Sequence, residues 1–262
     1  MDETCPACAC EQTVEMFEPF GPKDDSAPFR RCLHCATMFS PALAGREITQ
    51  DAWSRRLREP MPGDPVRHLA RLLGPSPSIA MAGRPDIAVL ESLKRGGAEV
   101  AACDPEKKHV AECAINKIPA RTTLPSREAL PGKYDLIFVA GLLEFVADPF
   151  AEITALKNHM TLDGQLRIET PSAKALVVEQ FGPRCSFFAP PAVRTLFTFD
   201  GLCLLLARAG FANVNLRRET PPTLPALFDR QPYPSKNARR FARFIDSRRA
   251  ERSILLVSAR VE

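Results

Sequence analysis

The chain has 262 residues, a length that suits one or two domains. Hydrophobic residues make up 45% of it, charged residues 25%, and the net charge is +4, so the balance is only mildly basic. No apolar run of about 18 residues and no signal-like leader occurs, so we expect no membrane span and no secretion. Nine cysteines in such a chain are typical of a reducing compartment, and the expected location is the cytoplasm.

Two Cys-x-x-Cys pairs, CPAC and CLHC, lie near the start of the chain. Each pair can occupy a tight turn that directs two sulfurs at one point, and two such turns supply the four thiolates of a closed, structural Zn²⁺ site. The alternative is two unrelated pairs of buried thiols. Cys10 and His34 lie close enough to be substitute ligands, and we expect them to be bystanders. The predicted metal ligands are Cys5, Cys8, Cys32 and Cys35.

The sequence divides into three predicted parts. Residues 1–40 form a zinc-binding ribbon, which has too little core to fold without its metal. Residues 41–77 form a helical connector, with short helices expected at Trp53–Arg58 and Val66–Leu73. Residues 78–262 form an α/β domain.

In this third part, strand and helix patterns alternate. The predicted strands are SIAMAG, AEVAACD, YDLIFVAG, GQLRIETP, ANVNLRRE and SILLVSARV. The predicted helices are Ile87–Arg95, Lys107–Ala114, a helix that begins at Pro149 with Asp148 as its cap, and Asp200–Ala209. Residues 172–198 have a less regular pattern. Such alternation predicts right-handed crossovers and a doubly wound, mostly parallel sheet covered on both faces.

Three segments of this domain resemble class I S-adenosylmethionine-dependent methyltransferases. The family's second strand, with its terminal acidic residue, resembles LKRGGAEVAACDPEKK. The region from its fourth strand to its fifth strand resembles KYDLIFVAGLLEFVADPFAEITALKNHMTLDGQLRIETPS. The helix before its sixth strand resembles FTFDGLCLLLARAGF. An N-terminal four-cysteine ribbon also occurs in this family, including some sugar-modifying members. The resemblance implies a seven-stranded sheet in which the last strand, Ser253–Arg260, is interior and antiparallel to the others.

The resemblance also implies where a cofactor would bind. In that family S-adenosylmethionine lies at the carboxyl ends of the first strands, which here would involve Gly83, Asp104, Gly141 and Leu142. Asp104 would hydrogen-bond the ribose hydroxyls, or alternatively cap the helix that follows it. The loop that begins at Gly141 would border cofactor and substrate, or alternatively be a plain strand-to-helix connection.

Several residues depart from the family pattern. The acidic position of the first loop falls on Met81, and its second and third glycines fall on Pro85 and Ile87. Proline removes a backbone donor, and a β-branched residue resists positive φ. Phe145 stands where a histidine is usual in the fourth-strand loop. The scaffold is therefore expected to be intact and the cofactor loop to be eroded.

The segment Asn237–Arg252 carries six arginines, with Phe241, Phe244 and Ile245 on one helical face. One interpretation is a surface helix packed on the sheet. The other is a contact for a phosphate-bearing substrate, nucleic acid or an acidic partner.

Three functions follow from these patterns. The first is an S-adenosylmethionine-dependent methyltransferase with a small or sugar-like acceptor, since methyl transfer from a sulfonium needs mainly in-line positioning. The second is a non-catalytic scaffold whose ribbon binds a protein partner. The third is a nucleic-acid methyltransferase or binder that uses the ribbon and the arginines.

Overall fold

The computed structural model describes residues 4–17, 27–44, 46, 48, 50, 73–128, 130–188, 193–217 and 254–261. The helices expected at Trp53–Arg58 and Asn237–Arg252, and all but the last residue of Val66–Leu73, lie outside this part of the chain. The division at residues 40 and 77 therefore stays a prediction. In the described ranges, no helix is long and apolar enough to cross a membrane.

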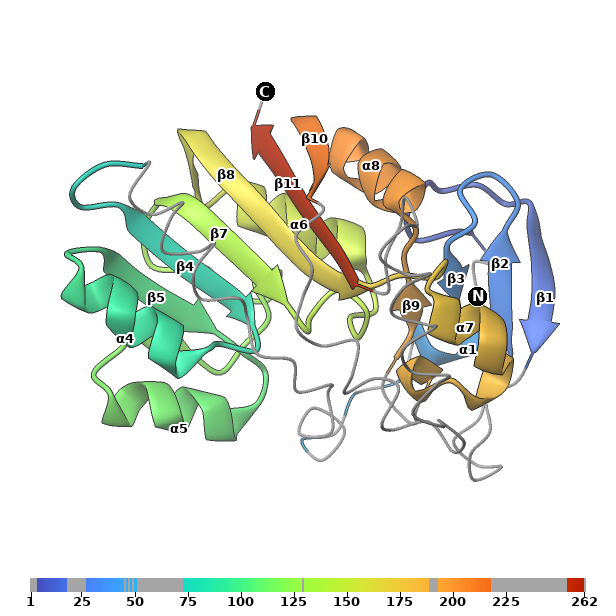
Figure 1. The fold of residues 1–262 in the computed structure, drawn as a ribbon, viewed down its shortest axis with the longest axis horizontal. Helices are drawn as coiled ribbons and strands as arrows, with labels where there is room; N and C mark the ends of the chain where they lie inside the picture. Colours follow the sequence, from blue (N-terminus) through green and yellow to red (C-terminus); the bar gives the residue numbers. More distant parts are fainter. Residues whose placement is uncertain are drawn as a thin grey trace, which may run out of the picture.

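A seven-stranded sheet forms the centre of the α/β part (Figure 1). Its strands, in spatial order, are β10 (Phe211–Arg217), β11 (Ile254–Val261), β8 (Met160–Pro171), β7 (Tyr134–Ala140), β4 (Ser78–Gly83), β5 (Glu99–Cys103) and β6 (Ala120–Arg121). Neighbouring strands from β8 to β6 are parallel, whereas β11 is antiparallel to both β8 and β10. The predicted mostly parallel sheet with an interior, antiparallel last strand is confirmed.

Helices cover both faces of this sheet, as a doubly wound fold requires. The longer helices are α4 (Ile87–Arg95), α5 (Lys107–Ile115), α6 (Pro149–Lys157) and α8 (Phe199–Arg208). Alternate strand residues separate the two sides: Met81 and Phe138 pack with α4 and α5, whereas Val139 and Ile168 pack with α6 and α8. Figure 1 shows α4 and α5 in front of the sheet and α6 behind it.

Aspartate side chains cap the first turn of two of these helices. The carboxylate of Asp86 accepts a hydrogen bond from the Val89 amide, 3.0 Å away, at the start of α4. The carboxylate of Asp148 accepts one from the Ala151 amide, also at 3.0 Å, ahead of Pro149 in α6. These caps satisfy amides that have no partner within a helix, and the second confirms the predicted cap.

The irregular stretch between β8 and α8 contains more structure than its pattern indicates. It holds α7 (Leu176–Phe181), two 3-10 turns (Gly182–Arg184 and Ser186–Phe188) and the two-residue strand β9 (Thr195–Leu196). Because β9 is so short, it has no periodicity that a sequence can reveal.

The strand β9 belongs to a second, four-stranded sheet at the right of Figure 1. Its order is β1 (Thr13–Phe17), β2 (Phe29–Cys32), β3 (Met38–Phe39) and β9, and every neighbouring pair is antiparallel. The short helix α1 (Pro41–Ala44) follows β3. The cysteine-rich segment is therefore joined to the α/β part by a shared sheet.

Thr198 is the residue that joins the first turn of α8 to this second sheet. Its hydroxyl accepts a hydrogen bond from the Gly201 amide at 2.9 Å and donates one to the Cys35 carbonyl at 2.5 Å. Its side chain is fully buried. At the other end of the helix, the Arg208 guanidinium donates to the Ala7 carbonyl at 2.8 Å.

Replacing Thr198 should therefore weaken both the helix and the junction. Thr198→Val keeps the shape of the side chain but removes the helix cap and leaves the Cys35 carbonyl without this donor. We expect a loss of about 1–3 kcal/mol in the free energy of unfolding. Thr198→Ser keeps the hydroxyl and should lose less than about 1 kcal/mol, the cost of one buried methyl group. Urea unfolding measures both, and equal losses would show that the hydroxyl has no such role.

Candidate functional site

The four predicted ligand cysteines converge on one point between the two turns of the ribbon. Their Sγ atoms all lie within 4.8 Å of one another. The Sγ atoms of Cys5 and Cys35 are 3.6 Å apart, and those of Cys8 and Cys32 are 3.5 Å apart. A tetrahedral zinc with Zn–S bonds of about 2.3 Å separates its sulfurs by about 3.8 Å. The four sulfurs could therefore coordinate one tetrahedral Zn²⁺ with only small shifts of the cysteine side chains.

The two turns have the same backbone form. The residue after each pair, Ala9 or Ala36, has a positive φ (59° and 58°). Its amide donates to the carbonyl of the first cysteine, at 2.8 Å in the Cys5 turn and 3.0 Å in the Cys32 turn. This repeated geometry aims all four sulfurs inward. Alanine is unusual there, since L side chains disfavour this conformation.

Interactions within the cluster change the acidity of its thiols. The hydrogen bond from Cys5 lowers the pKa of Cys35 to about 5. Burial raises the pKa of Cys8 to about 12, and the hydrogen bond to Cys35 raises that of Cys5. A bound cation would favour the ionised form of all four thiols.

Neither of the two substitute ligands belongs to the cluster. Among the described residues, the group that could hold a metal contains only the four predicted cysteines. Cys10 contributes its carbonyl, which accepts from the Cys5 amide at 2.9 Å. His34 contributes its amide, which lies 3.4 Å from the Cys32 sulfur, and its side chain is exposed.

Asp104 lies at the carboxyl end of β5, but its carboxylate already has partners. It is fully buried. One oxygen accepts from the Glu106 amide at 2.9 Å, and the other lies 2.7 Å from Nδ1 of His109. The same nitrogen is 3.2 Å from the Glu106 carboxylate. This arrangement resembles the alternative in which Asp104 stabilises the start of the helix that follows it. A ribose could bind the Asp104 carboxylate only if the contact with His109 opened.

The loop after β4 requires a glycine at one position, and it has Pro85 and Ile87 at the other two positions where the resemblance implies glycine. Gly83 has φ +92°, and a Cβ there would collide with the Ala140 carbonyl oxygen at the end of β7. Close packing of β4 on β7 thus requires a glycine at this position. Pro85 is buried and offers no amide donor, and the helix begins at once with Asp86 as its cap and Ile87 as its first residue.

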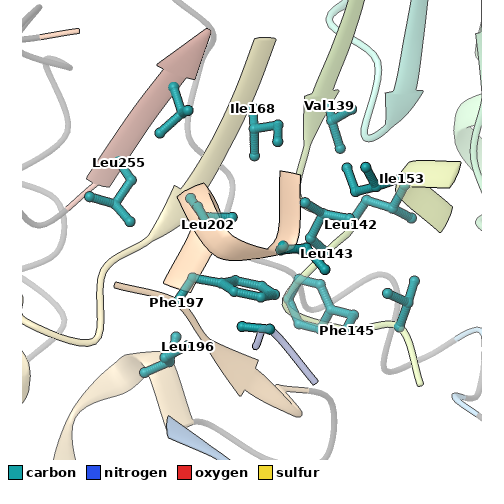
Figure 2. Close-up of a cluster of buried hydrophobic side chains, with 14 of the residues drawn as sticks. Val139, Leu142, Leu143, Phe145, Ile153, Ile168, Leu196, Phe197, Leu202 and Leu255 are labelled. Carbon is teal, nitrogen blue, oxygen red and sulfur yellow. The ribbon is translucent and has the colours of Figure 1, made fainter. Parts of the chain in front are cut away.

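The loop after β7 turns its side chains into the core. Gly141 takes a positive φ of 59°, and then Leu142, Leu143 and Phe145 are buried. Figure 2 shows these three side chains beside Phe197, near the end of β9. Of the predicted cofactor residues in this loop, Leu142 can therefore offer a ligand only its backbone.

A cavity of about 610 Å³ opens at the carboxyl edge of the sheet. Loops after β5, β6 and β7 supply most of its wall, and the connector adds three described residues. Gln50 of the connector spans the start of α5: its amide nitrogen donates to the Pro105 carbonyl at 2.8 Å, and its amide oxygen accepts from the Lys107 amide at 3.0 Å. None of the four predicted cofactor residues lines the cavity.

Comparison with solved structures identifies this architecture. No protein-family model matches the sequence, and no curated protein matches it either. An S-adenosylmethionine-dependent methyltransferase from Mesorhizobium loti superposes with a TM-score of 0.54 at 18% identity, covering 74% of this chain and 96% of that one. A methyltransferase from Archaeoglobus fulgidus gives 0.54 at 15% identity, covering 76% and 92%. The chain therefore has the class I S-adenosylmethionine-dependent methyltransferase fold, with a four-cysteine cluster at its N-terminus.

Sequence reasoning missed the residues that make the cavity basic. They are Arg46, Lys107, Arg127 and Arg194. Each lies in a different segment of the chain, so no local motif unites them. The signal available was indirect: Lys107 and Arg127 each follow a strand of the parallel sheet, and the carboxyl ends of parallel strands meet at one edge.

The zinc site generates a direct test. Purified protein should contain about one Zn²⁺ per chain, since four thiolates saturate a tetrahedral ion. Cys32→Ser should lower the zinc content and the hydrogen-exchange protection of the ribbon, whereas Cys10→Ser should change neither. Elemental analysis and exchange mass spectrometry measure both. Metal-free protein with a fully protected ribbon would contradict this site.

The two alanines of positive φ generate a second test. Ala9→Gly and Ala36→Gly should each stabilise the protein by about 1 kcal/mol, because glycine adopts this conformation without the steric cost of Cβ. Ala7→Gly, in the same turn at a residue without positive φ, should instead destabilise it. Denaturant unfolding of the metal-loaded proteins measures these differences. Stabilisation by none of the three changes would mean that the turns are not strained.

Proposed function

We propose that the protein is a cytoplasmic methyltransferase that transfers a methyl group from S-adenosylmethionine to a small or sugar-like acceptor. The observation that supports this proposal is the class I strand order, together with a cavity of about 610 Å³ at the carboxyl edge of the sheet, which would hold the acceptor because none of the four proposed cofactor residues lines it. Ligands of doubly wound sheets bind at this edge, and the volume suits a small molecule.

The cofactor would supply an activated methyl group on a sulfonium. The chain would contribute binding and orientation, because displacement at that methyl depends mainly on alignment of the acceptor. In this proposal, Asp104 accepts hydrogen bonds from the ribose hydroxyls after its contact with His109 opens. The backbone at Gly83, Gly141 and Leu142 borders the rest of the cofactor. Four cysteines hold a structural zinc that has no part in the chemistry.

A second candidate is a non-catalytic scaffold that binds a protein partner through the ribbon. Two of the residues at the proposed cofactor site favour the scaffold, because they are poorly suited to bind S-adenosylmethionine. Asp104 is fully buried against His109, and Pro85 removes an amide donor where the family has a glycine. In this alternative, the methyltransferase fold serves only to present a surface that binds a protein partner.

Calorimetric titration with S-adenosylmethionine separates the two candidates. If Asp104 holds the ribose while Pro85 and Ile87 obstruct the methionine end, the native protein should bind weakly. Asp104→Ala should then abolish binding, and Pro85→Gly with Ile87→Gly should strengthen it about tenfold to a hundredfold, the equivalent of one hydrogen bond to a charged group.

Two further variants control for folding and for general charge. Asp104→Asn keeps an acceptor for the Glu106 amide, so it should stay folded and still bind less cofactor. Asp163→Ala removes an exposed carboxylate from β8 and should change nothing. Tight native binding that is indifferent to Asp104 would contradict the proposed site, and no binding by any variant would favour the scaffold.

A further inference from the structure

We propose that the cavity at the carboxyl edge of the sheet binds a small phosphate-bearing molecule, through the cationic side chains of Arg46, Lys107 and Arg127. This inference concerns the chemistry of the ligand. It stands whether the phosphate compound is the methyl acceptor of the proposed function or the ligand of a protein without that activity.

The charge of the cavity wall is the first argument. Of its thirteen described lining residues, four are basic and none is acidic. Low-dielectric walls of one charge sign concentrate ligands of the opposite sign. Burial lowers the pKa of Arg194 to about 10, so this guanidinium still carries its charge at neutral pH.

The second argument is that three of these cations are available to a ligand. Arg46, Lys107 and Arg127 are exposed, and in the described ranges none of their side chains has a hydrogen bond or ion pair. Arg194 differs, because its guanidinium donates to the Arg46 carbonyl and so has a structural role. Two or more cations around one cavity suit a dianion, whose oxygens accept several charge-assisted hydrogen bonds.

The carboxylates nearest in sequence do not neutralise the cavity. Ser126 donates two hydrogen bonds to Glu152, at 3.0 and 2.5 Å, and burial raises the pKa of this carboxyl. Glu128 pairs with Arg121. Asp104 and Glu106 both contact His109. Each of these acids thus has a partner outside the cavity, although Arg127 also attracts Glu152 and lowers its pKa by a smaller amount than burial raises it, and none of them lines the cavity.

The remaining wall defines the rest of the ligand. Ile48, Leu124, Phe145 and Val146 provide an apolar surface, and the hydroxyls of Thr122 and Thr123 add polar groups. An apolar wall beside clustered cations suits a molecule with a flat or hydrocarbon body and a charged end. A nucleoside monophosphate has this character, and a sulfonium cofactor lacks the dianionic group.

Paired titrations of the full, metal-loaded chain test the proposal. Adenosine 5′-monophosphate and adenosine differ only in the phosphate, and we expect the phosphate to raise affinity at least about tenfold. Arg127→Gln and Lys107→Gln should each remove about tenfold of the monophosphate affinity and leave adenosine unchanged. Arg127→Lys should keep part of it. Lys133→Gln, an exposed lysine just before the amino end of β7, is the matched control and should have no effect. Binding of the monophosphate should also weaken with added salt.

The outcomes separate this inference from the proposed function. Preference for the monophosphate that depends on Arg127 and Lys107 supports the inference, even where S-adenosylmethionine does not bind. Equal affinity for adenosine and its 5′-monophosphate, no binding of the monophosphate, or monophosphate binding that neither variant changes would overturn it. Any of these results together with Asp104-dependent binding of S-adenosylmethionine would leave the methyltransferase proposal in place.

Discussion

The strand β9 is the connection on which the arrangement of the two sheets depends. Thr195 and Leu196 pair with Phe39 and Met38 of the ribbon. On the other side, the amides of Arg194 and Thr195 both donate to the Glu144 carbonyl, at 2.7 and 3.1 Å. Two residues of extended chain thus join the cysteine-rich sheet to the loop that follows β7. Since each of these backbone groups is buried, losing the pairing would leave polar groups without partners.

This connection gives the cysteine cluster an influence beyond the ribbon. A structural metal adds its binding free energy to folding, and a metal held by this cluster would stabilise the α/β part by two routes. One is the hydrogen bond between the Cys35 carbonyl and Thr198, which begins α8. The other runs from β3 through β9 to Glu144. The loop after β7 is held from the ribbon side, although no cysteine touches the cavity.

The sequence predicts the features that repeat or have a fixed spacing. Runs such as YDLIFVAG reveal buried strands, and two Cys-x-x-Cys pairs reveal four converging sulfurs, because both signals are local. Contacts between distant residues leave no such signal. The pairing of β9 with β3 joins residues 158 positions apart (Leu196 with Met38) and 156 positions apart (Thr195 with Phe39), and it depends on tertiary packing alone. The contact of His109 with Asp104 could likewise not be read from residue types, since it depends on how α5 leaves β5.

The side chains of Pro85 and Ile87 and the cations at the sheet edge have a common physical consequence. Glycine amides suit a ligand that lies close along the backbone, and an acidic residue that is not already bonded suits ribose hydroxyls. In this chain Pro85 supplies no amide, and Asp104 is bonded to His109. In the phosphate site inferred above, long cationic side chains would contribute most of the recognition and would favour a negatively charged ligand. The fold sets where a ligand binds, and the loop residues determine whether the site prefers a negatively charged ligand.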